Sequence, residues 1–518
     1  MRASLGGKTQ GEAGMAAGQA AARIPVLIGA GEVVDRPVEP RLALEPAALM
    51  TEALRRAAED AGAPALLAAI DSLDIVNSVS WPYADLPAAL ASRLGGAPRR
   101  LVYGPVGGES PVRFLHEAAL RIARGESEVS AVVGGEATHA VAQARKAGIE
   151  LPWTEGDPNW RRTRGRDYLH PLSVRLGVAD PVSVYPFYEN AVEAHLGQSP
   201  AEGQAESAAL WSAFSGVAAR NPAAWLKREY SAEEIGTPGP ANRPIAYPYT
   251  KLQVANPMVN QGAALLLTSL DRARAAGVPE ERMAFLWGGA AGVEPRDYLN
   301  RDHYHEAHAQ NAVLDACARI AAAEGSGFGI CELYSCFPCV PKMAARRLGL
   351  PVGMAPTTTG GLTFFGAPLN NYMTHAAAAM LRALRAGRDE AALLYGQGEF
   401  VTKHHAVVLA RRPARDELAE TYSVQAEADA RRGPVPAFAE AAEGPARIET
   451  FTVLHDREGA PEQGVVILRL ADGRRGLARV PAADADAIAL LLRRDRTPIG
   501  TPGLAALAGD GVPEWRPD

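Results

Sequence analysis

The chain has 518 residues, of which 47% are hydrophobic and 22% charged, and this balance excludes a wholly disordered protein. The 53 basic and 59 acidic residues leave a net charge of −6, which excludes a charge-driven nucleic-acid or membrane-surface partner. No apolar run approaches the roughly 20 residues needed to cross a bilayer. The four cysteines are too few for a secreted disulfide scaffold, so we expect a cytoplasmic protein. At roughly 100–200 residues per domain, the length predicts about three domains.

Strand and helix patterns alternate through the first part of the chain. Residues 1–23 are small and polar without a continuous apolar stretch, and we expect a disordered tail there. Strands are predicted at 24–28, 70–79, 100–103 and 129–133, and helices at 46–61, 87–94 and 111–124. This alternation is typical of a layered α/β domain.

The pattern breaks between residues 140 and 248, where aromatic residues, prolines and arginines are interleaved with short helical stretches. We interpret this region as one long, mainly helical insertion that lies over the α/β core. Alternation then resumes, with strands predicted at 262–268, 283–288, 329–333, 391–395 and 406–409, and helices at 309–324, 340–348 and 371–386. The strand ends at Val132–Glu136 and Leu394–Glu399 are similar, which favours two related halves.

The end of the chain changes character after a charged stretch that finishes in Gly433-Pro434-Val435-Pro436. We interpret residues 413–435 as a linker. Strands are predicted beyond it at 448–454, 465–470 and 476–480, with Asp472-Gly473 in a turn. Residues 436–518 are therefore predicted to form a small β-barrel domain.

Four segments, taken together, resemble the thiolase superfamily, and most closely the thiolase-like proteins of type 1. Those proteins are often labelled acetyl-CoA acetyltransferases and carry an added C-terminal β-barrel domain. The segments occur in thiolase order and are Met258–Ser269, Leu333–Phe337, Gly360–Pro368 and Tyr395–Gly398.

The resemblance implies an α/β thiolase fold. Such a fold has two related βαβαβαββ halves layered α/β/α/β/α, here with a mainly helical loop insertion and a small OB-like C-terminal barrel. The implied units are an N-terminal half at 24–268 with its insertion at 140–248, a C-terminal half at 269–412, and the added domain at 436–518.

The sequence departs from the thiolase pattern at three positions. Thiolase chemistry uses a thiolate at a helix N-terminus, a histidine that takes its proton and a second cysteine as acid/base. In this chain the nucleophile position falls on Gly108, the histidine position on Ala367 and the Cys-x-Gly position on Gly396. The resemblance therefore implies a protein that is not a conventional thiolase.

One thiol remains in Tyr334-Ser335-Cys336-Phe337, which resembles the His-Asp-Cys-Phe motif of the sterol-carrier-linked thiolases. On this resemblance Cys336 is the candidate acid/base, and Tyr334 stands in place of the histidine. Cys336 and Cys339 also have the spacing of a redox pair, and an inert buried thiol is a further alternative.

Two groups of residues complete the candidate site. Lys403 and His404 follow the degenerate Cys-x-Gly loop and are candidates to polarise a carbonyl or act as a base. The alternatives are that Lys403 faces solvent and that the histidine caps the following strand. The candidate substrate-binding residues are Gly108, Ser110, Gly361, Pro368 and Gly398. By resemblance, Gly108 and Gly398 offer backbone N–H groups to a thioester oxygen, whereas turn glycines and helix capping by Ser110 are the alternatives.

Two clusters outside these motifs, one of histidines and one of arginines, each allow more than one interpretation. The histidines at 303, 305 and 308 suggest zinc, but a polar loop also explains them, and we expect neither a metal nor a cofactor beyond coenzyme A thioester as substrate. Arg161, Arg162, Arg164 and Arg166 lie where the thiolase loop domain usually meets the CoA phosphates, and arginine suits phosphate; a solvated basic loop is the alternative.

Three functions remain open at this point. The first is an acyl-CoA-handling enzyme of the acyltransferase class, which uses Cys336 with Lys403 or His404. The second is a thiolase-like aldolase, a lyase that cleaves a hydroxyacyl-CoA with Tyr334 as acid/base. The third is a non-catalytic acyl-CoA-binding module. The expected partner in each case is acyl-CoA or CoA, and the expected assembly is a monomer or homodimer.

Overall fold

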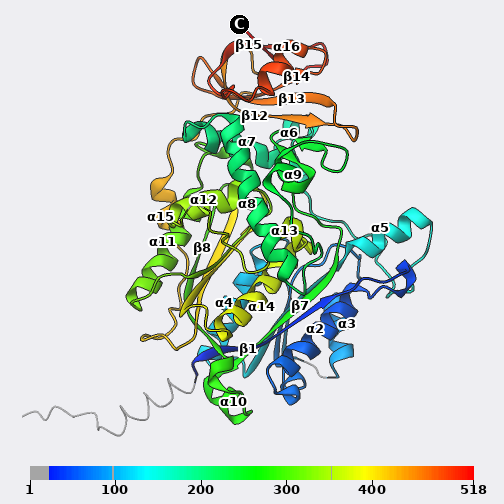
Figure 1. Cartoon of the computed structure of the whole chain (residues 1–518), viewed down its shortest axis with the longest axis vertical. Helices are drawn as coiled ribbons and strands as arrows, with labels where there is room; N and C mark the ends of the chain where they lie inside the picture. The colour runs from blue at the N-terminus through cyan, green and yellow to red at the C-terminus, as the bar shows by residue number, and fades with distance from the viewer. Residues whose placement is uncertain (1–22, 96–97, 352) are drawn as a thin grey trace, which may run out of the picture.

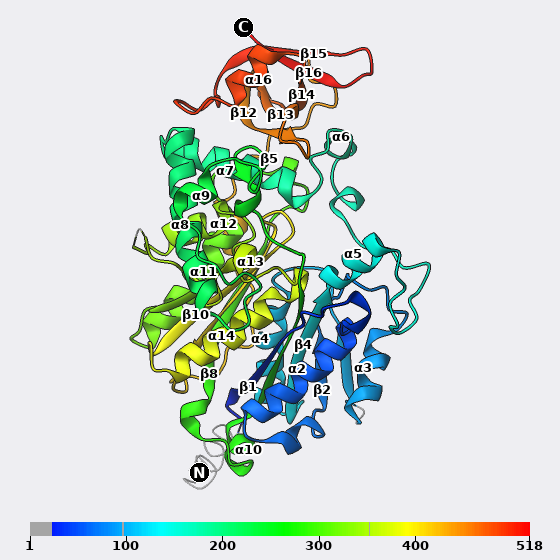
Figure 2. The ribbon, with the colours of Figure 1, turned by 45° about the vertical axis from the view of Figure 1, so that its right-hand side comes forward.

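Continuous apolar runs such as Val26–Ile28 and Leu265–Leu267 form central strands of a nine-stranded mixed sheet in the computed structural model, which describes residues 23–95, 98–351 and 353–518. These runs are buried on both faces because helices cover the sheet from both sides (Figure 2). The strands in spatial order are β3 (Arg100–Tyr103), β2 (Ser72–Ile75), β4 (Val129–Ala137), β7 (Asn260–Ser269), β1 (Pro25–Val34), β8 (Ala284–Val293), β11 (Lys403–Ala410), β10 (Ala391–Gly398) and β9 (Ile330–Leu333).

The sheet consists of two similar halves that meet where β1 pairs with β8. In the first half β2 is parallel to β4, and β7 and β1 follow antiparallel. In the second half β9 is parallel to β10, and β11 and β8 follow antiparallel. The second half has no counterpart of β3 among the residues described.

Two helices lie between the halves and are buried on nearly every side. These are α4 (Ser110–Ala123) and α14 (Tyr372–Arg385), which pack on each other. Helix α4 contacts β4 and β7 of the first half and β10 and β11 of the second. Both helices bury most of their residues in this interior layer and leave arginines such as Arg113 and Arg382 exposed.

Outer helices complete the predicted α/β/α/β/α layering. Helix α2 (Pro46–Asp60) covers β1, β4 and β7, and α11 (His308–Ala323) covers β8 and β11. The remaining helices around the core are α3 (Leu86–Leu94), α10 (Leu270–Ala275), α12 (Cys339–Arg347), α13 (Gly361–Phe364) and α15 (Gln425–Arg431). Helix α15 lies within the segment predicted to be a linker.

The segment between β4 and β7 is mainly helical, as predicted, and lies between the sheet and the far end of the molecule (Figure 1). Its elements are α5 (Thr138–Ala147), α6 (Pro171–Arg175), α7 (Pro181–His195), α8 (Pro200–Arg220), α9 (Ala232–Gly236), β5 (Pro244–Ala246) and β6 (Tyr249–Thr250). Helix α8 begins with a capping box, in which Ser199 Oγ accepts from Glu202 N and the Glu202 carboxylate accepts from Ser199 N.

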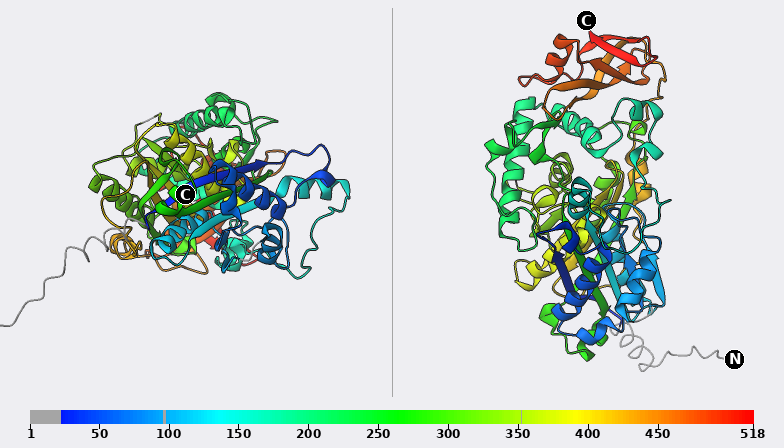
Figure 3. Two further views of the ribbon diagram at one scale, coloured as in Figure 1. Left: turned by 90° about the horizontal axis from the view of Figure 1, so that it is seen from below. Right: turned by 90° about the vertical axis from the view of Figure 1, so that its right-hand side faces the viewer.

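The C-terminal strands form a small closed barrel at the end of the molecule opposite β1 (Figure 3). Around the barrel the order is β13 (Pro461–Leu470), β14 (Arg475–Pro481), β16 (Pro513–Pro517), β15 (Pro502–Leu507) and β12 (Gly444–His455), which pairs again with β13. Helix α16 (Ala485–Leu491) packs on β12, β13 and β14. Strand β5 of the insertion pairs with β12 outside this ring, so the insertion and the barrel share a sheet.

A buried arginine fixes the barrel to the α/β core. Arg475 is 0% exposed, and its guanidinium donates to both carboxylate oxygens of Glu449 at 3.0 and 2.5 Å. It also donates to the carbonyl of Leu299 at 2.7 Å and to those of Arg301 and Asp302, all in the core. The carbonyls and the carboxylate together satisfy a charge that would otherwise be costly to bury.

No helix in the described ranges is both long and apolar enough to cross a membrane.

Replacement of Arg475 by lysine is expected to lower the free energy of unfolding by about 3–5 kcal/mol, because an ammonium cannot reach the same set of partners. Urea denaturation of the full chain measures this loss. The matched control is Arg469→Lys, since Arg469 donates to the same Glu449 at 2.7 Å from a more exposed position. Equal losses in the two variants would contradict the role given to Arg475.

Candidate active site

Loops from both halves of the sheet meet beyond the carboxyl ends of β2, β3, β9 and β10. The loop after β3 leads into α4, and the loop before α14 lies beside it. Asn370 fastens the two loops, since its Oδ1 accepts from Gly107 N at 2.9 Å and its Nδ2 donates to the carbonyl of Asn77 at 2.9 Å. Ligand sites of α/β sheets commonly lie in such a crevice.

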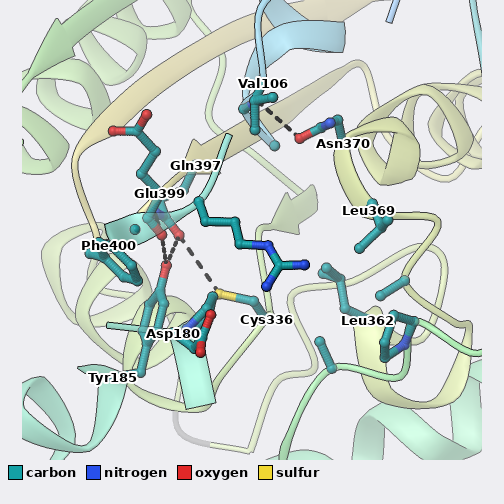
Figure 4. A pocket seen from close by; sticks show the side chains of 18 of the residues that line it. Val106, Asp180, Tyr185, Cys336, Leu362, Leu369, Asn370, Gln397, Glu399 and Phe400 are labelled. Carbon is teal, nitrogen blue, oxygen red and sulfur yellow. Dashed lines mark hydrogen bonds between the residues drawn. The ribbon is translucent and has the colours of Figure 1, made fainter. Parts of the chain in front are cut away.

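A cavity of about 500 Å³ opens at this point (Figure 4). Its size is within the range of pockets that bind small ligands. Predicted site residues Gly108, Tyr334 and Cys336 line it, together with residues from the insertion. The other polar lining residues are Arg162, Thr163, Arg164, Tyr168, Asp180, Tyr185, Asn370, Gln397 and Glu399.

The hydroxyl of Tyr334 occupies the space that a side chain at position 108 would need. A Cβ built on Gly108 would lie 2.7 Å from Tyr334 Cζ, closer still to the hydroxyl, and 2.5 Å from the carbonyl oxygen of Gln397. Position 108 is the one that the resemblance assigns to the thiolase nucleophile. Burial raises the pKa of Tyr334 well above its usual value of 10.0, so this hydroxyl keeps its proton at neutral pH.

A buried carboxyl lies directly behind Gly108. Glu109 is 7% exposed, and its Oε2 has no hydrogen-bond partner among the residues described. A Cβ on Gly107 or Gly398 would collide with this carboxyl, so both glycines leave the room that it fills. Burial raises the pKa of Glu109 to about 7, against the opposing charge of Lys403. Glu109 therefore titrates near neutral pH.

The thiol of Cys336 faces the cavity without a base beside it. Its Sγ lies 3.7 Å from Gln397 Oε1, and the Tyr185 hydroxyl donates to that same oxygen at 2.9 Å. Burial raises the pKa of Cys336 to about 12, so the thiol stays protonated. Cys336 and Cys339 are both free thiols, and burial raises the pKa of Cys339 as well.

One edge of the cavity is a charged, strained turn after β10. The carboxylate of Glu399 receives hydrogen bonds from Arg296, the shortest 2.7 Å, and lies 2.9 Å from Lys403 Nζ. Glu399 and Val401 have φ values of 58° and 56°, which are unfavourable for residues with side chains. Leu369, across the cavity, has a φ of 46°. Such strain is commonly found around functional sites.

Arginines of the insertion line another edge. A second hollow of about 600 Å³ shares Arg162, Thr163 and Arg164 with the cavity and also includes Arg161 and Arg166. Burial lowers the pKa of Arg162, and the nearby Glu136 opposes this shift. The two hollows thus adjoin along a loop that carries four arginines.

The remaining predicted residues lie outside the cavity lining. The Lys403 ammonium is held by Glu399 and by the carbonyl of Val106 at 3.0 Å. The His404 Nδ1 lies 2.7 Å from the Tyr395 hydroxyl, and burial lowers the pKa of His404 to about 4. Ser110 Oγ donates to the carbonyl of Pro105 at 3.2 Å and does not cap α4.

The predicted glycines and proline act through the backbone. Gly361 has a φ of 77° and begins α13, where a Cβ would meet Phe214 at 2.5 Å. Pro368 precedes the turn that carries Leu369 and Asn370. Gly398 lies behind the cavity wall, where a Cβ would come within 3.2 Å of Gly108 N.

Several residues of this site have no clear signal in the sequence. Glu109 was visible only as a polar residue at a predicted helix start. Glu399 follows the Gly396-Gln397-Gly398 motif directly, so its position was the available signal. Asp180 and Tyr185 lie at the start of α7 and within it, where the local sequence carries no signal for this cavity.

The similarity to known proteins agrees with this fold. Residues 401–505 match the model of a family described as the thiolase-like protein type 1 additional C-terminal domain. A monomeric SCP2-thiolase-like protein type 1 from Mycobacterium smegmatis is 32% identical, with a TM-score of 0.80; the match covers 96% of this chain and 99% of that one. No curated protein sequence matches this chain.

More distant solved structures share the α/β core. An Ltp2–ChsH2(DUF35) aldolase is 17% identical over 75% of this chain and 98% of its own, with a TM-score of 0.58. Human mitochondrial 3-ketoacyl-CoA thiolase in complex with CoA is 12% identical over 75% of this chain and 98% of its own, with a TM-score of 0.53. These similarities confirm the predicted thiolase fold.

Replacement of Gly108 by alanine is expected to destabilise the protein by about 1–3 kcal/mol, because the new Cβ would overlap the Tyr334 ring and the Gln397 carbonyl. In a Tyr334→Ala background the loss is expected to shrink without vanishing, since the Gln397 contact remains. Denaturation of the two single variants and the double variant measures this coupling. Gly327→Ala is the matched control, because a Cβ there meets nothing within 4 Å. Additive effects of Gly108→Ala and Tyr334→Ala would contradict the overlap.

Replacement of Glu109 by glutamine is expected to stabilise the protein increasingly as pH rises from 4.5 to about 7. The folded carboxyl keeps its proton up to about pH 7, whereas an unfolded one ionises near 4.5, so ionisation lowers wild-type stability across this window. Above about pH 7 the difference in the free energy of unfolding between Glu109→Gln and wild type is expected to level off, at up to about 3 kcal/mol. Thermal unfolding over pH 4–8 checks this, with Glu117→Gln on the same helix as the control for lost charge. A difference that does not change with pH would rule out the buried titration.

Proposed function

The chain belongs to the SCP2-thiolase-like proteins of type 1, and on that premise we propose that it binds an acyl-CoA thioester without forming an acyl-enzyme. The acyl end would lie in the 500 Å³ cavity, and the CoA phosphates would lie against the arginine loop. The observation that carries the proposal is the Tyr334 hydroxyl in place of a side chain at position 108.

Tyr334 is suited to polarise a carbonyl. Its proton is held firmly, since burial raises its pKa, and its hydroxyl lines the cavity. A hydrogen bond from this hydroxyl to the thioester oxygen would stabilise negative charge that develops there, as donors of an oxyanion hole do. Gly108, which has no side chain, lets the ligand approach the backbone at the same place.

Acyl transfer through Cys336 has weak support. A thiol becomes a nucleophile when a base takes its proton or a nearby positive charge lowers its pKa. The partner of Cys336 is the Gln397 amide oxygen, which cannot act as such a base, and burial raises the pKa of the thiol to about 12. A proton donor at Cys336 fits this environment better than a covalent carrier.

The arginine loop supports recognition of the CoA part. Arginine binds phosphate through a planar fork of donors, and Arg162, Arg164 and Arg166 line the hollow that adjoins the cavity. Human mitochondrial 3-ketoacyl-CoA thiolase, whose structure contains CoA, is similar to this chain in fold alone.

A lyase is the second candidate function, and Glu109 is the observation that favours it. Cleavage of a β-hydroxyacyl-CoA into a carbonyl product and a shorter acyl-CoA needs a donor at the thioester oxygen and a base for the hydroxyl proton. Tyr334 is the donor. Glu109, with a pKa of about 7, lies directly behind the cavity wall as the candidate base, which a water molecule would connect to substrate. The likeness to the Ltp2–ChsH2(DUF35) aldolase is one of fold alone.

Calorimetry with acetyl-CoA and longer acyl-CoAs is expected to give saturable binding that Arg164→Ala weakens. Tyr334→Phe is expected to weaken binding of the thioester by about tenfold and of free CoA little, because it removes one hydrogen bond to the thioester oxygen. Intact-mass measurement after incubation is expected to give no adduct on Cys336. Arg145→Ala, on the exposed side of α5, is the matched control for lost positive charge.

The outcomes separate the candidate functions. An adduct that disappears in Cys336→Ala would overturn the non-covalent proposal in favour of acyl transfer. Carbonyl products from β-hydroxyacyl-CoAs, lost in Glu109→Gln, would establish the lyase. Binding without turnover of any tested thioester would favour a binding module, and absence of binding would refute the proposal.

A further inference from the structure

A cluster of imidazoles and carboxylates lies between the α/β core and the barrel, away from the cavity. The segment before α11 contributes Asp302, His303, His305 and Glu306, and His308 is the first residue of α11. Two sets of donor atoms have mutual separations within 4.8 Å: one joins Asp302, His303 and His308, and the other joins His303, His305 and Glu306. His303 belongs to both sets.

The distances around His303 Nε2 leave room for an ion between it and the two neighbouring carboxylates. Its Nε2 lies 3.6 Å from Asp302 Oδ2 and 3.5 Å from Glu306 Oε1, which is longer than the usual hydrogen bond. Its Nδ1 is buried without a partner among the residues described. Donor atoms about 2.0–2.2 Å from a tetrahedral zinc ion are about 3.3–3.6 Å apart, so the gap around Nε2 fits an ion.

Ring orientation identifies which histidines converge. The rings of His303 and His308 are 5.0 Å apart and meet at 69°, so their nitrogens are able to point to a common centre. The His303 and His305 rings are stacked at 3.9 Å and 18°, and His195 of α7 stacks on the other side of His305 at 3.9 Å. Parallel stacked rings cannot both hold one ion in their planes, so His305 and His195 support His303 by packing.

The carboxylates are themselves oriented. Asp302 Oδ2 is 2.7 Å from His308 Nε2 and accepts from Gly433 N at 2.8 Å. Glu306 Oε2 accepts from Asn311 Nδ2 at 2.7 Å, which leaves Oε1 toward His303. Such outer hydrogen bonds are typical of metal ligands and hold them in position.

We propose that Asp302, His303 and His308 bind a divalent transition-metal ion, with zinc as the best fit and Glu306 or water at the open position. Two imidazoles and a carboxylate suit zinc in both donor type and number. Asp302 Oδ2 and His308 Nε2 are now hydrogen-bonded to each other at 2.7 Å, and a bound ion would lie between them and replace this hydrogen bond. This assignment departs from the expectation of no metal drawn from the sequence.

The position gives the ion a structural role. Gly433, in the segment that leads to the barrel, donates to Asp302, and Arg475 of the barrel donates to the Asp302 carbonyl at 3.3 Å. His308 is the first residue of α11. One ion would therefore join the core helix, the connecting segment and the barrel, and its binding energy would add to their stability.

The test uses the full chain, prepared without a histidine tag, treated with a chelator and titrated with Zn²⁺. The expected result is one ion per chain by elemental analysis, with micromolar or tighter affinity and a rise in Tm. His303→Phe is expected to abolish stoichiometric binding and the rise in Tm, since phenylalanine keeps a ring for the stack but has no nitrogen. The matched control is His170→Phe, because His170 lies at Glu440 and Phe438, outside the cluster.

A second readout places the ion. Cobalt(II) bound by nitrogen and oxygen donors gives weak visible bands, whereas thiolate ligands add an intense charge-transfer band. The expected spectrum has no thiolate band and is lost in His303→Phe and in His308→Gln. Absence of stoichiometric binding, binding that persists in both histidine variants, or a thiolate band would each overturn the assignment.

Discussion

The packing of α4 against α14 is the contact on which the rest of the molecule depends. Both helices contact both halves of the sheet, so their burial fixes how the halves face each other. Their N-terminal loops then meet at one point, where Asn370 joins Gly107 to the strand end at Asn77. The cavity is a consequence of this packing: its two walls come from parts of the chain far apart in sequence, and neither half alone would enclose it.

Desolvation sets the chemistry inside that enclosure. The Tyr334 hydroxyl and the Cys336 thiol keep their protons because burial penalises their charged forms, and Glu109 holds its proton up to about pH 7 for the same reason. Tyr334 and Cys336, which line the cavity, thus keep protons that they are able to donate. Positive charge lies on the arginine loop, on Arg296 beside Glu399, and on Lys403, which is held by Glu399 and acts on Glu109. The buried hydroxyl and thiol are therefore neutral, whereas the charged lining residues include Asp180, Glu399 and Arg162.

Sequence was informative where a signal is local. The strand predicted at 100–103 coincides with β3. Tyr334, Cys336 and Gly108 were assigned to one site by the thiolase resemblance, and all three line the cavity. Strands β15 and β16 were missed, since Pro502-Gly503 and Pro513 look like turns until the barrel supplies partners. Tyr185, in α7 of the insertion, donates to Gln397 of β10, and no local sequence pattern indicates this contact. The position of Ser110 at a predicted helix start is typical of an N-cap residue, but its hydroxyl donates to the Pro105 carbonyl instead.

The shared sheet between insertion and barrel has a consequence for the order of folding during synthesis. Strand β5 pairs with β12 through Ala246 and Leu454, and Tyr247 N donates to the Val453 carbonyl at 2.8 Å. When the insertion leaves the ribosome, the residues that pair with it have yet to be translated. The edge of β5 therefore stays open until the end of the chain emerges, and an open edge is where a nascent chain pairs with the wrong neighbour. The sheet shared by the insertion and the barrel is therefore completed only after β12 has been translated.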